Sequence, residues 1–396
     1  MTTLLITNIG RLFTATDHGV IVDAALLVDG ERISWVGAAA DRPPTDPDDV
    51  VDVEDALVTP GLIDAHTHPV YAGDRLAEIA LRSSGASYAD IAAAGGGIRA
   101  TVAATRGASR DELAWLVTSR MRSWLASGTT TIEAKTGYHL ERDGELGAVA
   151  LLAGLGAAPL MPRVEVTFLG AHDVGPEYAG RADDYVAAVS TWCAEAAAAG
   201  ARFVDVFCDT GYFTVDQSRQ VLEAGTRAGL RPRIHADELD RTGASLLAAE
   251  MAVVSADHVL RIIKEDADAL ADAGVTATLC PVTAMAMRSL PPARLLVDQG
   301  VAVALGSDHN PGQSGTTSMS LVVGLAVHVL GLSVEEALVA ATAGGARAVA
   351  ANDRGTIVPG MLADLVAWDA EHEGAFAWHL GLTPRWVWKG GKEQHP

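Results

Sequence analysis

The central part of the chain alternates short apolar runs with longer segments of helical periodicity, which limits the possible folds more than any other feature. Segments such as "SRDELAWLVTSRMRSWLASG" place apolar residues at helical spacing and stop at glycine. The apolar runs are "TPGLIDAHTH", "TTTIEAKTG", "VEVTFLGAH", "FVDVFCD", "RPRIHADE", "MAVVSADH", "GVTATLCP" and "VAVALGSDHN". Continuous apolar strands are typical of a parallel sheet buried on both faces. Because eight such strands close a barrel, we predict an α/β fold of the (β/α)8 type.

Both ends of the chain have a different texture. Short β-type runs broken by glycine and aspartate fill the first 58 residues, and the last 41 residues repeat this pattern. We therefore expect a small β-sandwich domain built from residues 1–58 and 356–396. The barrel would then occupy residues 59–355, a length that such a barrel commonly uses.

Charge and composition exclude several classes of protein. The chain has 50 acidic and 29 basic residues, a net charge of −21, and no local basic cluster, so nucleic-acid binding is not expected. The N-terminus lacks the basic region of a signal peptide, and no apolar run approaches the roughly 18–20 residues that span a bilayer. Cys193, Cys208 and Cys280 are scattered, as expected for reduced core thiols of a cytoplasmic protein.

Histidine and aspartate residues gather at the carboxyl ends of the predicted strands, where barrel enzymes carry their chemistry. His66 and His68 end the first run, and residues two apart on a strand point to the same side. Buried imidazoles and carboxylates are costly unless they are paired or bind a metal. We therefore predict one divalent metal per chain, Zn²⁺ or iron (Fe²⁺/Fe³⁺). The predicted ligands are His66, His68, His235 and Asp308.

The same positions indicate catalytic roles. Asp308 is the predicted base that collects a proton from the metal's water. Glu238, three residues after a predicted ligand, is expected to move a proton onto the leaving nitrogen, with a rim salt bridge as the alternative. His258 could polarise the carbonyl under attack. Lys135 is the only lysine near a strand end that could form a bridging carbamate, and the fourth run offers none, which favours a mononuclear site.

Taken together, these runs resemble the amidohydrolase superfamily and, within it, the imidazolonepropionase family. The resemblance covers nearly the whole chain. It rests on "PGLIDAHTHPVYAGDR", "SYADIAAAGGGIRATVAATR", "GTTTIEAKTGY", "TFLGAH", "DVFCD", "HADE", "SADH" and "SDHNPG", in that order. It implies a hydrolase that adds water to 4-imidazolone-5-propanoate and opens the ring to N-formimino-L-glutamate in histidine degradation. A small heterocyclic substrate with a carboxylate tail and a homodimer are further implications.

Residue by residue, the resemblance implies the same four metal ligands and a set of substrate contacts. A guanidinium suits the propanoate because it binds a carboxylate through two parallel hydrogen bonds, although a surface ion pair is the more common use of an arginine. Tyr88 either reaches the site or packs beside it. The implied substrate contacts are Arg75, Tyr138, His172, Glu238, Asn310 and Gly312.

Four residues depart from the usual family pattern, and we expect them to touch the pocket that selects the substrate. They are His139 in "TGYHL", Val282 in "TLCPVTAM", and His309 and Gln313 in "DHNPGQ". They leave open a related ring hydrolase, or an aminohydrolase (deaminase), that acts on a neighbouring heterocycle with the same metal. A non-catalytic binding protein is the third alternative, disfavoured because all four ligands are present.

Overall fold

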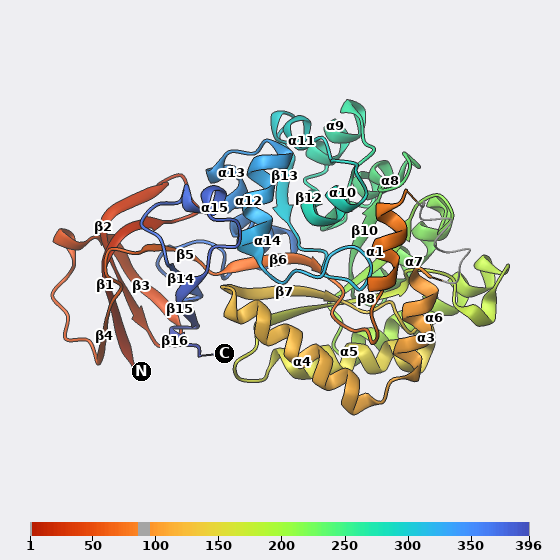
Figure 1. Ribbon diagram of the computed structural model, residues 1–396, viewed down its shortest axis with the longest axis horizontal. Coiled ribbons are helices and arrows are strands. Elements are labelled where there is room, and N and C mark those ends of the chain that lie inside the picture. The colour runs from red at the N-terminus through yellow and green to blue at the C-terminus, as the bar shows by residue number, and fades with distance from the viewer. Residues whose placement is uncertain (1, 86–95, 396) are drawn as a thin grey trace.

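The computed structural model of the chain describes residues 2–85 and 96–395, and these form two sheets of eight strands each (Figure 1). One sheet has the order β13-β12-β11-β10-β9-β8-β7-β6, with parallel pairing throughout. Its strands are β6 (Leu62–Thr67), β7 (Thr129–Lys135), β8 (Arg163–Ala171), β9 (Phe203–Cys208), β10 (Arg231–Ala236), β11 (Ser255–His258), β12 (Thr276–Leu279) and β13 (Ala302–Leu305). Each strand coincides with one of the eight apolar runs, which confirms the predicted barrel.

The first and last strands of this sheet meet just past their carboxyl ends and close the barrel. Thr67 and His309 form a parallel β-bridge. The amide of Asp308 donates to the carbonyl of His66 (2.9 Å), and the amide of His68 donates to the carbonyl of His309 (2.9 Å). The closure therefore brings residues from the two ends of the barrel segment against each other at the rim where the site was predicted.

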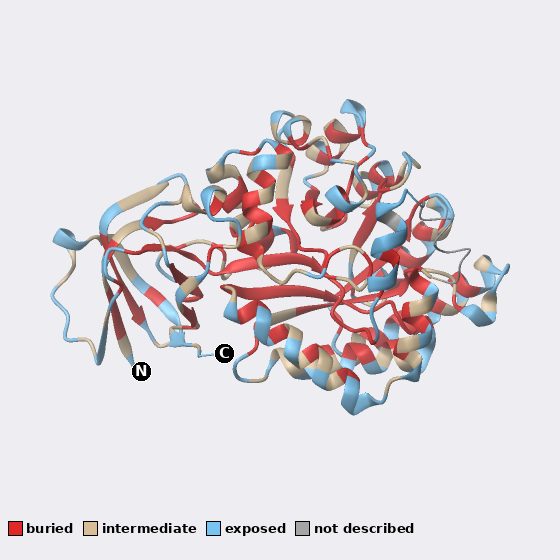
Figure 2. Ribbon diagram, in the orientation of Figure 1, coloured by how far each residue is buried: buried red, intermediate tan, exposed pale blue. Residues whose placement is uncertain are grey.

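Helices surround the barrel, and Figure 2 shows that its strands are buried while the outer helix faces are exposed. The helices that follow β6 to β9 are α1 (Leu76–Ser83), α3 (Ile98–Gly107), α4 (Arg110–Ala126), α5 (Arg142–Gly156), α6 (Ala182–Ala199) and α7 (Val215–Arg227). Those that follow β10 to β13 are α8 (Ala244–Glu250), α9 (Lys264–Asp272), α10 (Pro281–Ala286), α11 (Ala293–Asp298), α12 (Met319–Leu330), α13 (Val334–Ala340) and α14 (Ala343–Ala348). Tyr88 lies outside the described residues.

The second sheet is built from both ends of the chain, so the separate terminal sheet is also observed, while the domain boundaries themselves stay a prediction. Its order is β16-β15-β14-β5-β1-β2-β3, with β4 paired to β1. Its strands are β1 (Thr3–Phe13), β2 (Val20–Asp29), β3 (Arg32–Ala38), β4 (Asp49–Asp52), β5 (Leu57–Pro60), β14 (Leu365–Trp368), β15 (Pro384–Lys389) and β16 (Lys392–Glu393), and the short helix α15 (Ala375–Trp378) accompanies them.

Gly61 alone separates the terminal sheet from the first barrel strand. Its amide donates to the carbonyl of Asp364 (2.8 Å), and a Cβ atom here would lie 2.2 Å from Thr130 Oγ1. Only glycine therefore allows the chain to enter the barrel so close to β7.

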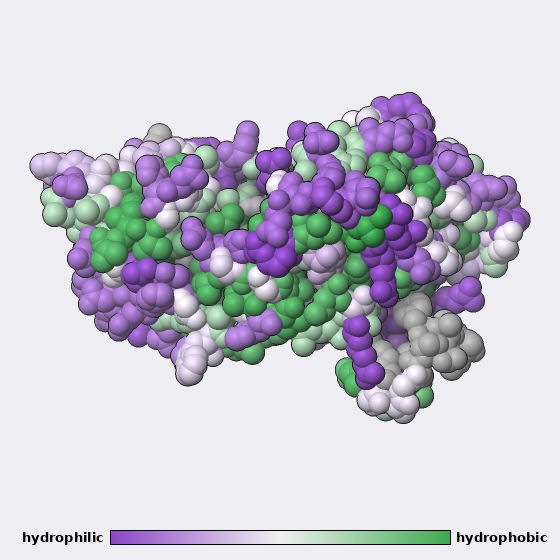
Figure 3. Space-filling model, turned by 90° about the horizontal axis from the view of Figure 1, so that it is seen from above, coloured by the Kyte–Doolittle hydropathy of each residue, from purple (hydrophilic) through white to green (hydrophobic). Residues whose placement is uncertain are grey.

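The remaining expectations concern cysteines and membranes. Cys193, Cys208 and Cys280 are free and buried, as expected for core thiols. Within the described part of the chain, no helix has the length and apolar character needed to cross a membrane. On the face shown in Figure 3, hydrophobic residues form separate groups among hydrophilic ones.

Two helical glycines should respond to alanine in opposite ways. We expect Gly344→Ala in α14 to lower the free energy of unfolding by about 1–3 kcal/mol, because its Cβ would lie 2.1 Å from the carbonyl oxygen of Val303. A Cβ atom at Gly147 in α5 would meet no atom within 4 Å. Gly147→Ala should therefore raise the free energy of unfolding by up to about 1 kcal/mol. Urea denaturation of both variants measures the difference, and equal effects would contradict the packing described here.

Candidate active site

A cavity of about 320 Å³ opens at the carboxyl ends of the barrel strands. Nine of the predicted site residues line it. They are His68, Arg75, Tyr138, His172, His235, Glu238, His258, Asp308 and Asn310. His66 lies beneath His68, fully buried, and Gly312 lies behind Arg75. The structure therefore brings together residues that are spread over more than 240 positions of the sequence.

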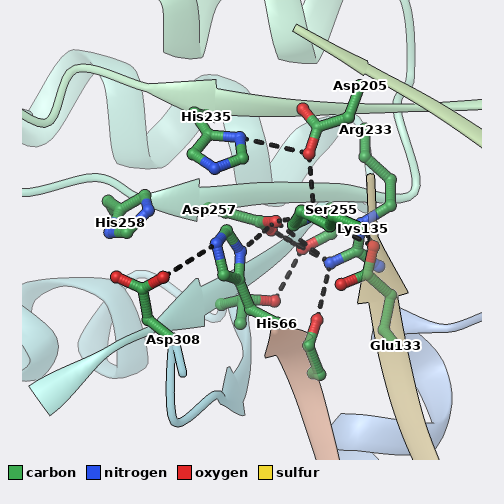
Figure 4. A network of polar contacts seen from close by, with 12 residues as sticks. His66, Glu133, Lys135, Asp205, Arg233, His235, Ser255, Asp257, His258 and Asp308 are labelled. Atoms are coloured by element: carbon green, nitrogen blue, oxygen red, sulfur yellow. Dashed lines mark hydrogen bonds and ion pairs between the residues drawn. The ribbon is translucent and has the colours of Figure 1, made fainter. Parts of the chain in front are cut away.

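Three histidines converge at the bottom of this cavity. His66 on β6, His68 directly after that strand and His235 on β10 each offer a donor atom, and these atoms lie within 4.8 Å of one another. The Nε2 atoms of His66 and His68 are 3.1 Å apart. Asp308 Oδ1 lies 3.6 Å from the first of these atoms and 3.5 Å from the second. Figure 4 shows Asp308, His66 and His235 grouped in this way.

The donor atoms of this cluster fit a divalent metal. His235 Nε2 is buried and has no hydrogen-bond partner among the described residues, which is costly unless a ligand occupies it. Burial lowers the pKa of both His66 and His68 well below the ordinary range, so both rings are neutral, the form that binds metals. Three neutral imidazoles with one carboxylate suit Zn²⁺ or iron.

A second set of donor atoms overlaps the first. His66, His258 and Cys280 also have donor atoms within 4.8 Å of one another. Burial raises the pKa of the Cys280 thiol well above its ordinary value, so the thiolate that a metal binds is disfavoured. The set with the carboxylate of Asp308 is therefore the better candidate.

Lys135 does not have the surroundings of a metal-bridging carbamate. Its Nζ donates to Asp205 Oδ2 (2.7 Å), Glu133 Oε1 (3.0 Å) and Asp257 Oδ2 (3.2 Å). Burial lowers its pKa, but the charges of Asp205 and Glu133 outweigh this and raise the pKa above the ordinary value. Lys135 is therefore an ammonium group, which is consistent with the expected mononuclear site.

Two carboxyl groups, those of Asp308 and Glu238, line the cavity. Burial raises the pKa of Asp308 to about 6, and Thr283 Oγ1 donates to its Oδ2 (2.5 Å). Burial, reinforced by the charge of Asp308, raises the pKa of Glu238 well above its ordinary value, which favours the protonated form. Its Oε1 lies 3.8 Å from Nδ1 of His258, whose pKa burial lowers to about 3. The cavity thus holds a carboxylate that can accept a proton and a carboxylic acid that can donate one.

A turn after β10 fixes the position of Glu238. The carboxylate of Asp209, which follows β9, accepts hydrogen bonds from the amides of Glu238 (2.8 Å) and Leu239 (2.8 Å). Asp237 accepts from the amide of Ser245 (2.8 Å) at the start of α8. These two aspartates hold the turn so that Glu238 faces the cavity instead of solvent, and the side chain makes none of the rim salt bridges considered above with a described Lys or Arg.

Arg75 reaches the cavity with its guanidinium already oriented. Its Nε and Nη2 atoms contact the carboxylate of Glu78 at 2.9 Å and 2.8 Å, and Glu78 also accepts from the amide of Gly97 (2.7 Å). A Cβ atom at Gly312 would lie 2.5 Å from Arg75 Nη1. The Asn310 side chain accepts from the amide of Gly312 (2.8 Å) and so holds that glycine against the arginine.

Tyr138 and His172 form the opposite wall. His172 Nδ1 donates to the carbonyl oxygen of Gly137 (3.1 Å), and its ring stacks on that of His68 with centroids 5.0 Å apart. The Tyr138 ring lies 5.2 Å from His172. Gly137 has φ +114°, and a Cβ atom there would lie 2.9 Å from His172 Nδ1, so this turn requires glycine.

The expectation that all four departures touch the pocket is wrong for three of them. Gln313 lines the cavity, whereas His139, Val282 and His309 are not among the described lining residues. The His139 ring packs against Gly144, where a Cβ atom would lie 2.4 Å from His139 Cδ2. His309 bonds to Tyr71 and to the carbonyl of Thr316, because the chain turns away from the cavity after Asp308.

Eight of the described lining residues were not predicted, among them two aromatic residues and two residues that follow α10. Phe207 on β9 and Tyr212 after it pack with ring centroids 4.0 Å apart, and Met287 and Arg288 follow α10. The aromatic residues in "VFCDTGYF" were the available signal for the first pair. Arg288 has φ +57° and is exposed, without a side-chain ion pair among the described residues.

Known proteins of one kind match this chain along nearly its whole length. An imidazolonepropionase from Mycolicibacterium smegmatis is 44% identical over 389 residues, which cover 96% of this chain and 95% of that protein. The imidazolonepropionase from Streptomyces griseus is 42% identical and covers 99% of both chains. The amidohydrolase family model matches residues 170–393. The chain belongs to the imidazolonepropionase family of amidohydrolases.

Solved structures agree with this fold. A triazine hydrolase variant has a TM-score of 0.76 at 17% identity and covers 99% of this chain and 94% of its own. An adenosine deaminase from Xanthomonas campestris with bound zinc has a TM-score of 0.74 at 20% identity and covers 99% and 92%. At such identity these structures bear on the fold alone. Amidohydrolases are metal-dependent, and the histidine cluster is the part of this chain that suits a metal.

We expect metal removal to destabilise the protein. A metal that binds only the folded chain stabilises it, by about 2.7 kcal/mol at one hundred times its Kd. Calorimetry should therefore show a lower Tm after chelation, restored by Zn²⁺. His235→Ala should abolish most of that difference, whereas His18→Ala, at an exposed residue of the terminal sheet, should preserve it. A wild-type Tm that is indifferent to chelation and to added metal would contradict the site.

Proposed function

We propose that this chain hydrolyses 4-imidazolone-5-propanoate to N-formimino-L-glutamate, a step of histidine degradation. The observation that carries the proposal is a histidine–aspartate cluster at the bottom of a cavity that also holds a buried glutamate, Glu238, and an oriented arginine. Membership of the imidazolonepropionase family supports it. Water adds to the ring carbonyl carbon, the ring C–N bond breaks, and the leaving nitrogen takes up a proton.

The residues divide this reaction between them. A divalent metal, held by the three cluster histidines and Asp308, would act as a Lewis acid and lower the pKa of water. Asp308 accepts the proton of the attacking water. Glu238, whose raised pKa favours the protonated form, donates to the leaving ring nitrogen. Neutral His258 lies within reach of Glu238 and polarises the carbonyl.

Arg75 binds the propanoate tail of the substrate. Glu78 holds one edge of its guanidinium, so the group is presented in a fixed orientation, which limits the entropy lost on binding. Tyr138 and His172 form the wall that faces the ring, and Asn310 with Gly312 supports the arginine. A substrate with a carboxylate tail is thereby favoured over a neutral heterocycle.

Further details belong to the same proposal. We infer one Zn²⁺ or iron ion per chain, because the four ligands converge on one place and Lys135 is an ammonium group. A homodimer and a cytoplasmic location follow from the resemblance to the family. Of the four departures, Gln313 alone is among the described lining residues, and it forms part of the cavity wall.

A direct assay tests the activity. Purified, metal-analysed protein should consume freshly prepared 4-imidazolone-5-propanoate, with loss of its ultraviolet absorbance, and mass spectrometry should identify formiminoglutamate. Release of ammonia without that product would indicate a deaminase instead. Absence of any conversion by protein with one metal per chain would contradict the proposed substrate.

Glu238→Gln should lower kcat by about 10²–10⁴-fold, because the amide cannot transfer the proton. Its metal content should stay the same, since Glu238 is not among the proposed ligands. Glu250→Gln, at an exposed residue paired with Arg219, is the matched control and should retain full activity. Loss of metal from Glu238→Gln would make this residue a ligand and contradict the assigned role.

A further inference from the structure

Five ionisable side chains lie beneath the metal-ligand histidines, inside the barrel, and the reaction described above uses none of them. All have 0% exposed surface. Three are carboxylates and two are cations, and Figure 4 shows them as one network. They are Glu133 and Lys135 on β7, Asp205 on β9, Arg233 on β10 and Asp257 on β11.

Two of the carboxylates stand directly behind metal-ligand histidines. Asp257 Oδ2 lies 2.7 Å from His66 Nδ1, and because a carboxylate only accepts, the imidazole donates from Nδ1. This leaves Nε2, the atom nearest Asp308, with its lone pair for a metal. Asp205 Oδ2 lies 3.1 Å from His235 Nδ1 on the other side of the cluster.

Lys135 contacts the same two oxygen atoms. Its Nζ lies 2.7 Å from Asp205 Oδ2 and 3.2 Å from Asp257 Oδ2. Each oxygen is therefore shared between the ammonium group and one histidine. A single side chain on β7 thus connects a ligand on β6 with a ligand on β10, through carboxylates on β9 and β11.

We propose that Lys135 is a positioning residue that holds His66 and His235 in their metal-binding orientation through Asp257 and Asp205. The inference rests on the metal site of the proposed function. Second partners of ligating histidines fix ring orientation, and their loss commonly costs about 10–100-fold in metal affinity. Here one ammonium group fixes two such partners at once, so its loss releases two ligands together.

The competing explanation is that Lys135 only neutralises buried charge. Glu133 separates the two explanations because it belongs to the same network without contacting a histidine. Its Oε1 accepts from Lys135 Nζ (3.0 Å) and lies 3.6 Å from Arg233 Nε. If Lys135 only neutralised charge, substitution of Lys135 and substitution of Glu133 would have the same effect on metal affinity. If Lys135 positions the ligands, only its substitution should weaken metal binding.

The test measures Co²⁺ affinity of metal-free protein by competition with a chelator, together with the visible spectrum of the cobalt protein and Tm. We compare Lys135→Met, Glu133→Gln and the double variant. Lys135→Met should bind Co²⁺ at least tenfold more weakly and change the visible band that reports ligand geometry. Glu133→Gln should lower Tm while its Co²⁺ affinity stays within twofold of wild type.

The double variant keeps the test decisive if Lys135→Met does not fold. It removes one cation and one anion, so the net charge of the network is unchanged. We expect the double variant to fold. It should bind Co²⁺ more weakly than wild type and show an altered visible spectrum, because the ligand histidines are no longer held in place. Wild-type affinity and spectrum in the double variant would overturn the positioning role.

These outcomes are separate from those that test the activity. Tight Co²⁺ binding by wild type, lost in the lysine variants, supports positioning even if imidazolone propanoate is not a substrate. Conversely, turnover with unaltered Co²⁺ binding in the double variant overturns positioning and leaves the proposed function intact. Failure of wild-type protein to bind Co²⁺ would overturn both.

Discussion

Burial of five charged side chains at the centre of the barrel is the constraint on which the rest of the structure depends. An unpaired buried charge is costly, and each of these has an oppositely charged partner on another strand. The partners meet only if the strands keep their register, because a slip of one residue turns every inward side chain outward. The pairing therefore selects one alignment of β7, β9, β10 and β11, and the histidines above it inherit that alignment.

The strand periodicity explains how polar residues come to lie in stacked layers. Glu133 and Lys135 are two residues apart on β7, and Arg233 and His235 are two apart on β10, so both members of each pair point inward. The earlier members of the two pairs, Glu133 and Arg233, carry opposite charges, and the later members are the ammonium group of Lys135 and the imidazole of His235. Charge compensation thus extends from the layer below the site up to the layer that holds the metal-ligand histidines.

Much of this arrangement could be predicted from the sequence. Alternating apolar runs and helical segments predict the barrel, and the position of His66, His68, His235 and Asp308 at strand ends predicts their convergence. The partners of Lys135 could not be predicted, because strand parity shows that a side chain points inward but not which side chains from other strands it meets. The prediction that His139 and His309 touch the pocket was wrong for a related reason, because the turns that follow the strands determine where these two residues lie.

The floor of the site consists of residues on or shortly after the barrel strands, whereas much of its wall comes from turns such as the one that carries Arg288 after α10. The two parts have separate structural supports: the floor depends on pairing inside the barrel, and the turns depend on their own backbone hydrogen bonds, such as the amide of Arg288 to the carbonyl of Met285 (3.0 Å). Such a division makes the scaffold modular. Grafting a different segment after α10, where Met287 and Arg288 line the cavity, offers a route to new ring substrates that leaves Asp209 and Thr283, and so the supports of Glu238 and Asp308, in place.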